Sequence, residues 1–266
     1  MNVPWPPLSA RFAEARRRLI FALDVDTLGD AERLVDELLG EVGLFKIGKQ
    51  LFVHAGPEVV RLVRRKGGEV FLDLKFHDIP RTVARAGVEA TRLGVKMFDV
   101  HASGSTEMMQ ATVREVTGTC RREGLRKPKI LAVTVLTSLS SADLKSVGVA
   151  AGVESQVVRL ACLAMESGMD GVVASPREIA SIRKACGRGF TIVTPGVRLA
   201  TEAWDDQKRV MTPEEAIRVG ADYLVVGKPI RDAASPREAA RGFVVEMERG
   251  FVASGRRTMG LLSRRV

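Results

Sequence analysis

The sequence predicts a single (β/α)8 barrel, and three observations carry that prediction. Eight short apolar runs alternate with amphipathic stretches over about 235 residues, the size of such a barrel. Most of these runs are apolar throughout, which is typical of parallel strands covered on both faces. The first run continues into residues 24–27 without the GxGxxG turn expected of a doubly wound open sheet, the structural alternative.

The predicted elements follow one another as strand and then helix. Strands are predicted at residues 19–25, 44–48, 69–75, 97–102, 129–136, 171–175, 190–196 and 223–230. Helices are predicted, among others, at residues 31–39, 57–65, 80–93, 103–122, 154–167 and 176–185. No linker or shift in composition divides this region, so we expect one barrel domain at residues 19–253. A basic extension at residues 1–18 and a basic tail at residues 254–266 flank it.

The net charge of +9 lies mostly at the two ends of the chain. The extension carries +3 and the tail +4, which leaves +2 for the barrel domain. A strongly basic protein suggests a polyanionic partner, but a nearly neutral body weakens that interpretation. We therefore expect neither nucleic acid nor membrane as a partner.

The cysteines and the apolar runs indicate a cytoplasmic protein. The three cysteines are far apart and form no CxxC pair, so neither a disulfide framework nor a zinc site is expected. No apolar run approaches the roughly 20 residues that span a bilayer. The proline-rich N-terminus lacks the apolar core of a signal peptide.

Charged residues occur at the carboxyl ends of three successive predicted strands. Asp24 lies at the end of the first strand, Lys46 lies on the second, and Asp73 and Lys75 end the third. Each one alone has the alternative of a buried ion pair that fixes packing. Four charges of alternating sign on adjacent strand ends favour an active site, because that end of a barrel carries the chemistry.

The third strand runs into the densest cluster, FLDLKFHDIP at residues 71–80. Period-two alternation places Asp73 and Lys75 on one face, and Asp78 follows before Pro80 opens a helix. A lysine held between carboxylates stays protonated, which suits a general acid or a charge stabiliser. His77 and His101 follow the third and fourth strands, and we expect them to be hydrogen-bonded rather than metal ligands.

Two later segments have the composition of a phosphate site. Gly196 and Arg198 lie at the end of the seventh strand, and Gly227 and Lys228 lie at the end of the eighth, where barrels commonly bind phosphate. The alternative is a pair of glycine turns with solvated cations. The polar residues 199–210 are open to two interpretations, a closing loop or a long solvated connection. Residues 43–50 nearly match a P-loop, but they end in glutamine and form a strand, so we reject that motif.

Seven segments, in order and spacing, carry a resemblance to a known family. They are FALD at 21–24, FKIG at 45–48, DLKFHDIP at 73–80, AVTVLTS at 132–138, TPGVR at 194–198, DQ at 206–207 and VGKP at 226–229. Over residues 19–240 the chain resembles the bacterial-type orotidine 5′-monophosphate decarboxylases. The resemblance implies a homodimeric lyase of de novo pyrimidine synthesis that converts orotidine 5′-monophosphate to UMP and CO₂ without cofactor or metal.

The resemblance also implies roles for individual residues. Lys75 would donate a proton to C6 of the pyrimidine, Asp73 would lie against the substrate carboxylate, and Asp78 would reach the partner subunit's site. Asp24 and Lys46 would bind the ribose hydroxyls, and Lys46 would also belong to the catalytic set with Lys75, Asp73 and Asp78. The further substrate-binding residues would be Ile79, Thr82, Thr137 beside the pyrimidine, and Arg198, Gln207, Gly227 and Lys228 at the phosphate, with Gln207 on a closing loop.

The chain departs from the family pattern at two positions. Lys228 stands where the family commonly has arginine, so the charge is kept but the bidentate fork is lost. Arg81 stands where relatives often carry a small polar residue, and its role is open.

Two other functions are compatible with parts of the sequence. A sibling acting on sugar phosphates would use magnesium held partly by a glutamate on the second strand, where Lys46 stands here and would repel the metal. A nucleic-acid-binding barrel would use the basic ends, so its affinity would fall steeply with salt. Deleting residues 1–18 and 254–266 would abolish the function of such a barrel, whereas we expect the decarboxylase to survive the deletion.

Overall fold

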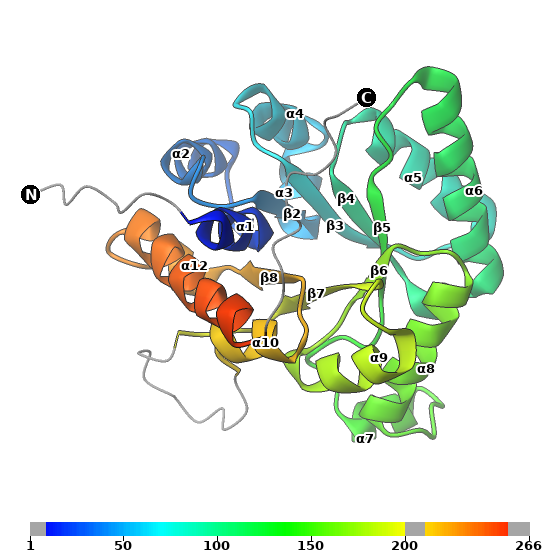
Figure 1. Ribbon diagram of the computed structural model, residues 1–266. Coiled ribbons are helices and arrows are strands. Elements are labelled where there is room, and N and C mark those ends of the chain that lie inside the picture. Colours follow the sequence, from blue (N-terminus) through cyan, green and yellow to red (C-terminus); the bar gives the residue numbers. More distant parts are fainter. Residues whose placement is uncertain (1–8, 200–210, 255–266) are drawn as a thin grey trace, which may run out of the picture.

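The structure, a computed structural model, describes residues 9–199 and 211–254 and confirms the predicted barrel (Figure 1). Eight parallel strands pair in sequence order, and the last pairs with the first to close the sheet. They are β1 (Leu19–Ala22), β2 (Leu44–Gly48), β3 (Val70–Phe76), β4 (Met97–His101), β5 (Lys129–Val133), β6 (Gly171–Val173), β7 (Thr191–Pro195) and β8 (Tyr223–Val226).

Helices surround the strands on the outside of the barrel (Figure 1). In chain order they are α1 (Ala10–Arg18), α2 (Leu28–Leu38), α3 (Lys49–Ala55), α4 (Glu58–Arg65), α5 (Pro80–Arg92), α6 (Thr106–Glu123), α7 (Ser141–Ser146), α8 (Val153–Glu166), α9 (Ile179–Cys186), α10 (Pro213–Val219), α11 (Lys228–Arg231) and α12 (Pro236–Ala253). Short 3₁₀ turns lie at Ala102–Gly104 and Pro176–Glu178. Among the described residues, no helix is long and apolar enough to cross a membrane.

Several strands end earlier than their apolar runs predict. β1 ends at Ala22 and β5 at Val133, although Leu23 and Val135 beyond them are buried. Burial alone therefore does not mark the end of the hydrogen-bonded ladder. The predicted eighth strand is wrong beyond Val226, because Lys228 begins α11 with a proline in the first helical turn.

Residues 10–18 of the predicted basic extension form α1, which packs against α12 at the other end of the chain. Phe12 and Ala15 are buried, and the Arg18 guanidinium lies 5.1 Å from the centre of the Phe251 ring. Gly43 passes so close that an added Cβ would lie 2.1 Å from the Arg17 carbonyl oxygen. Helix α1 is thus built into the barrel domain, while the predicted division of the chain into three parts stays a prediction.

The hydrophobic core has an inner part and an outer part. The inner part fills the barrel and consists of Ile20, Ala22, Leu44, Phe71, Met97, Leu131, Val193 and Val225. The strand residues between these positions, such as Leu19 and Phe21, belong to the outer part between the sheet and the helices. This alternation settles which side chains point into the barrel. Two residues further along each strand, the next inward layer lies at the carboxyl ends.

Candidate active site

The inward layer above the inner core is where the predicted charged residues meet. Asp24, Lys46 and Asp73 stand two residues beyond Ala22, Leu44 and Phe71, and Lys75 follows Asp73 by two more. The Lys46 Nζ atom lies 3.1 Å from Asp24 Oδ1 and 3.3 Å from Asp73 Oδ2. The Lys75 ammonium donates to Asp73 Oδ1. We name Asp24, Lys46, Asp73 and Lys75 the charge network.

Neighbouring charges keep Asp73 and Lys46 ionised in spite of their burial. Burial alone would raise the pKa of Asp73, but a hydrogen bond with Asp99 and the ammonium groups of Lys46 and Lys75 lower that pKa below its usual value. Burial alone would lower the pKa of Lys46, but the Asp73 and Asp24 carboxylates raise that pKa above its usual value. The site therefore holds fixed charges of both signs near neutral pH.

The backbone of β3 is irregular where it carries these charges. The β3–β4 ladder shifts register between Leu72 and Phe76, and Lys75 has a φ of 52°. A non-glycine residue in the left-handed region is uncommon and is found most often at functional sites. The Lys75 N–H donates to the side chain of Asp99 on β4, at 2.8 Å from Oδ1.

Glycine and histidine residues surround the charge network. An added Cβ at Gly48 would lie 3.2 Å from the Lys46 Nζ atom, so this glycine leaves the ammonium its space. The rings of His77 and His101 stack at 5.3 Å between centres. Burial, with His77 and nearby lysines, lowers the pKa of His101 to about 4, so this ring is neutral at physiological pH.

Three predicted site residues lie outside the network within one chain. Asp78, Ile79 and Thr82 are exposed, and the Ile79 side chain is 66% exposed. Asp78 Oδ1 accepts a hydrogen bond from the Ile79 backbone N–H at 2.6 Å, just before Pro80 begins α5. Among the interactions of the described residues, neither a hydrogen bond nor an ion pair joins Asp78 to Lys75.

The predicted phosphate residues lie at the ends of β7 and β8. Gly196 has a φ of 81°, which only glycine adopts without strain, and the Arg198 N–H donates to the Met211 carbonyl at 3.4 Å. An added Cβ at Gly227 would lie 3.6 Å from Asp24 Oδ2. The predicted phosphate side of the barrel mouth is therefore adjacent to the charge network. Lys228 and Arg198 are exposed. Gln207 lies outside the described residues.

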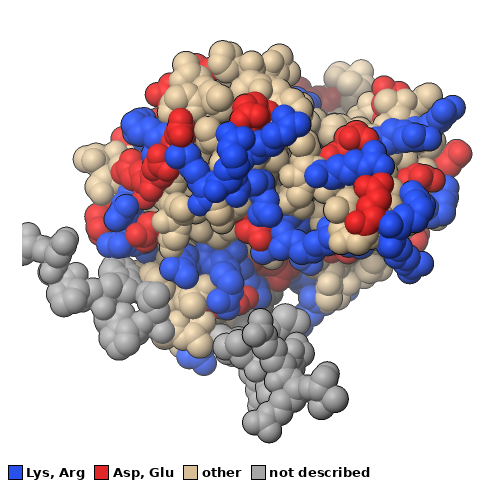
Figure 2. Space-filling view, turned by 90° about the horizontal axis from the view of Figure 1, so that it is seen from above, with Lys and Arg blue, Asp and Glu red and all other residues tan. Residues whose placement is uncertain are grey.

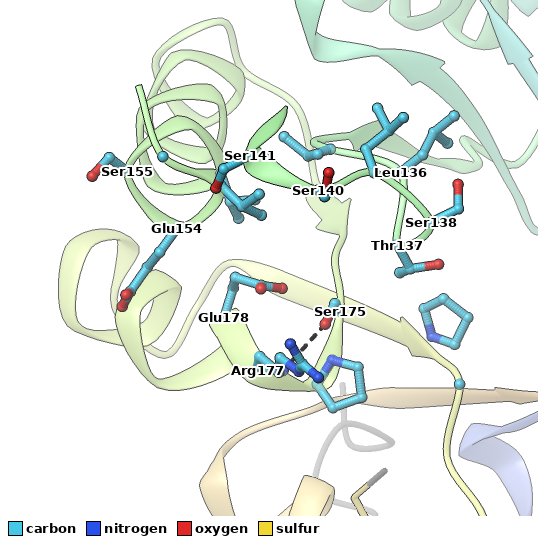
Figure 3. A pocket seen from close by; sticks show the side chains of 18 residues that line it. Leu136, Thr137, Ser138, Ser140, Ser141, Glu154, Ser155, Ser175, Arg177 and Glu178 are labelled. Carbon is cyan, nitrogen blue, oxygen red and sulfur yellow. Dashed lines mark hydrogen bonds between the residues drawn. The ribbon is translucent and has the colours of Figure 1, made fainter. Parts of the chain in front are cut away.

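A cavity of about 1160 Å³ opens beside the phosphate side (Figure 3). Thr137 lines it together with Pro195 and Gly196. The facing wall carries Ser175, Arg177 and Glu178 from the segment after β6, which the sequence had not singled out. Burial raises the pKa of Glu178, so this carboxyl group is held toward its neutral form.

Asp99, which contacts the charge network at Lys75 and Asp73, is a residue that sequence reasoning missed. It is fully buried, two residues beyond Met97 of the inner core, so it belongs to the same inward layer. A signal was present, because Asp99 is a charged residue in the middle of the apolar run 97–102. The rule that identified Asp73, a charge on an inward strand position, would have identified Asp99 as well.

Barrel and charge network together define a (β/α)8 enzyme fold with an ionic candidate active site at the carboxyl ends of its strands. The model of the Orotidine 5′-phosphate decarboxylase / HUMPS family matches residues 17–243, and the chain belongs to this family. Orotidine 5′-phosphate decarboxylases of Syntrophotalea carbinolica and Geotalea daltonii are 56% and 54% identical to it. The alignments cover 88% and 89% of this chain and 96% and 98% of the relatives, respectively.

The fold comparison points to the same group of proteins. A crystal structure of orotidine 5′-phosphate decarboxylase from Lactobacillus acidophilus is 34% identical and superposes with a TM-score of 0.78. The match covers 87% of this chain and 99% of that one. The family expected from the seven sequence segments is therefore confirmed by sequence and by fold.

Proposed function

We propose that this chain decarboxylates orotidine 5′-monophosphate to UMP and CO₂, as a lyase of pyrimidine biosynthesis. The observation that carries the proposal is the charge network, in which two lysines and two aspartates are paired within 3.3 Å at the carboxyl ends of β1–β3. Relatives at 54–56% identity are named orotidine 5′-phosphate decarboxylases, and that name identifies the substrate that we propose.

Lys75 has the chemistry that the difficult step needs. Loss of CO₂ from C6 leaves a carbanion in the plane of the pyrimidine ring, where no π-system accepts the charge. An ammonium group fixed by Asp73 stabilises that charge without solvent reorganisation and then donates its proton to C6. Asp73 repels the substrate carboxylate but not the neutral CO₂ that leaves. The reaction in this form draws on no cofactor or metal.

The remaining site residues bind the parts of the substrate that do not react. Asp24 and Lys46 take the ribose hydroxyls, because they form the edge of the network nearest Gly227 and the phosphate side. Thr137, in the wall of the cavity, takes the pyrimidine. Arg198, Gly227 and Lys228, with Gln207, take the phosphate, whose binding energy supports the reaction at a distance. Ile79 and Thr82 complete the substrate contacts.

We further propose a cytoplasmic homodimer in which Asp78 completes the partner subunit's network. The support is that Asp78 and Ile79 are exposed in one chain, Ile79 being a large apolar side chain at 66% exposure. A second copy covering this segment would bury Ile79 and bring an additional carboxylate to a lysine-rich site.

Ultraviolet absorbance of orotidine 5′-monophosphate mixed with the purified protein tests the activity. We expect turnover that EDTA leaves unchanged. No turnover would refute the proposal. Activity that EDTA abolishes, together with turnover of a sugar phosphate, would support the magnesium-dependent sibling instead.

Mixing two inactive variants tests the shared site. Lys75→Ala and Asp78→Ala subunits should each be inactive as homodimers, and their heterodimers should regain one intact site. Heterodimers that are confirmed by mass but stay inactive would exclude Asp78 from the partner's site.

The nucleic-acid alternative finds little support on the surface in view. Figure 2 shows blue and red side chains interspersed, and ion pairs such as Arg126–Glu69 and Arg92–Glu123 occur at the surface. Because α1 is packed into the domain, the truncation that tests this alternative should begin after residue 8 and end at residue 254. We expect the truncated protein to keep its decarboxylase activity.

A further inference from the structure

The Lys75 backbone needs a hydrogen-bond acceptor that the sheet does not provide. At the register shift between Leu72 and Phe76, β3 leaves its regular ladder with β4, and Lys75 takes a φ of 52°. A buried N–H without a partner is costly, and so is the left-handed conformation. Asp99 supplies the acceptor from within β4, with its Oδ1 atom 2.8 Å from the Lys75 nitrogen.

The second oxygen of Asp99 points to a proton on this side chain. Among the described residues, no donor reaches the buried Oδ2 atom. The Asp73 carboxyl group lies within hydrogen-bonding reach of Asp99. Burial and the adjacent Asp73 charge raise the pKa of Asp99 well above its usual value. A neutral Asp99 can donate from Oδ2 to the Asp73 carboxylate, and this bond satisfies both groups.

We propose that Asp99 is a positioning residue that fixes Lys75 and Asp73 together. One carboxyl oxygen holds the Lys75 N–H in the irregular turn of β3, and the other donates a proton in a hydrogen bond to Asp73. The buried Asp99 side chain then orients both Lys75 and Asp73, the two residues next to the reacting atoms. This inference rests on the proposed function, because it assigns Lys75 and Asp73 to the chemistry.

Two substitutions at Asp99 separate the hydrogen bonds from the packing. In Asp99→Asn, the amide oxygen can accept from the Lys75 N–H and the amide nitrogen can donate to Asp73. Asp99→Val places a β-branched side chain suited to a strand at this position and removes both bonds. Thr112→Ala is the control, because Thr112 is equally buried but lies on α6 and donates to the Met108 carbonyl, away from the network.

The expected result is a loss of kcat that follows the hydrogen bonds. Asp99→Val should lower kcat about 100-fold, the cost of misplacing a catalytic group by about 1 Å. KM for orotidine 5′-monophosphate and the affinity for UMP should change by less than about threefold, because binding groups are untouched. Asp99→Asn should restore kcat to within about threefold of wild type, and Thr112→Ala should leave it unchanged.

The Lys75 amide proton, observed by NMR in protein labelled with ¹⁵N-lysine, gives a readout that does not depend on activity. Its resonance should keep its wild-type shift in Asp99→Asn and move upfield in Asp99→Val. Wild-type kcat in Asp99→Val would overturn the proposal. If Asp99→Val does not fold, a 100-fold loss of kcat in Asp99→Asn with the amide shift retained would overturn it as well. Wild-type protein without turnover would instead refute the proposed function.

Discussion

The two sides of the barrel mouth hold their charges in different ways. On the β1–β4 side, Lys46, Lys75, Asp24 and Asp73 are paired with one another and fixed by the strand backbone. On the β7–β8 side, Arg198 and Lys228 are exposed, and neither forms a salt bridge with another described residue. On the first side each of the four charges already has a partner of opposite sign, whereas Arg198 and Lys228 on the second side have no salt-bridge partner among the described residues.

This difference matches the tasks that we propose for the two sides. Stabilising a short-lived carbanion requires charges that do not reorganise, so the protein supplies the counterions itself. Binding a phosphate requires cations that are not already paired within the protein, because such cations can form strong charge-assisted hydrogen bonds with the ligand. We therefore propose that the β1–β4 side governs the chemical step and that the β7–β8 side governs binding of the phosphate.

The largest effect should come from the charge that lies nearest the reacting carbon. We expect Lys75→Ala to lower kcat by about 10⁴-fold or more, because one ammonium serves as electrostatic stabiliser and as proton donor. UMP affinity, measured by calorimetry, should stay near the wild-type value.

Lys96→Ala is the matched control for this prediction, because Lys96 lies next to the amino end of β4 and pairs at 3.7 Å with Glu69. It should leave kcat unchanged. Substantial residual activity in Lys75→Ala would mean that the proton donor is another group.

Arg198 should show the opposite pattern, with an effect that depends on the phosphate. Arg198→Ala should lower kcat/KM for orotidine 5′-monophosphate by about 100-fold, the cost of a lost bond to a charged group. Steady-state kinetics with the nucleoside orotidine, which lacks phosphate, should show no effect of the substitution. Arg218→Ala, at an exposed position on α10, serves as the control. An equal loss with orotidine would contradict the division of tasks.

The sequence predicts the first side of the mouth better than the second, for a physical reason. Lys46 and Asp73 lie on strands and Asp24 lies two residues beyond β1, so period-two alternation still places all three on the inward face, where they meet. Lys228 was predicted to lie in a strand, but a proline starts a helix there. Alternation gives no information about loops, and the predicted Gln207 falls outside the described residues.

The residues missed in the sequence show which features a sequence pattern cannot predict. Asp99 could have been found from its place in an apolar strand, but the φ of 52° at Lys75 that gives Asp99 its task could not. That conformation depends on a register shift between two strands, which is a tertiary property. Helix α1 was missed because it is strongly basic, although its buried Phe12 and Ala15 are spaced for a helix face.

Substitutions on the two sides of the barrel mouth should also differ in their effect on the free energy of unfolding. Lys46→Met should lower the free energy of unfolding by about 2 kcal/mol, because it leaves the buried Asp73 with one ammonium partner fewer. Lys228→Met should change it by less than about 0.5 kcal/mol, because Lys228 is exposed and forms no salt bridge with a described residue. Urea denaturation of both variants measures the difference. Equal effects would show that the network is not prearranged in the free protein.

The smallest effect concerns the position where this chain departs from its family. Lys228→Arg restores the planar fork that binds two phosphate oxygens at once, so KM for orotidine 5′-monophosphate should fall by roughly threefold. kcat should not change, because the substituted group lies on the side that binds and not on the side that reacts. Steady-state kinetics with orotidine as the second substrate should show no difference between lysine and arginine. A KM that rises as far as in Lys228→Ala would mean that the longer guanidinium does not fit, and that the loop after β8 is built around a point charge.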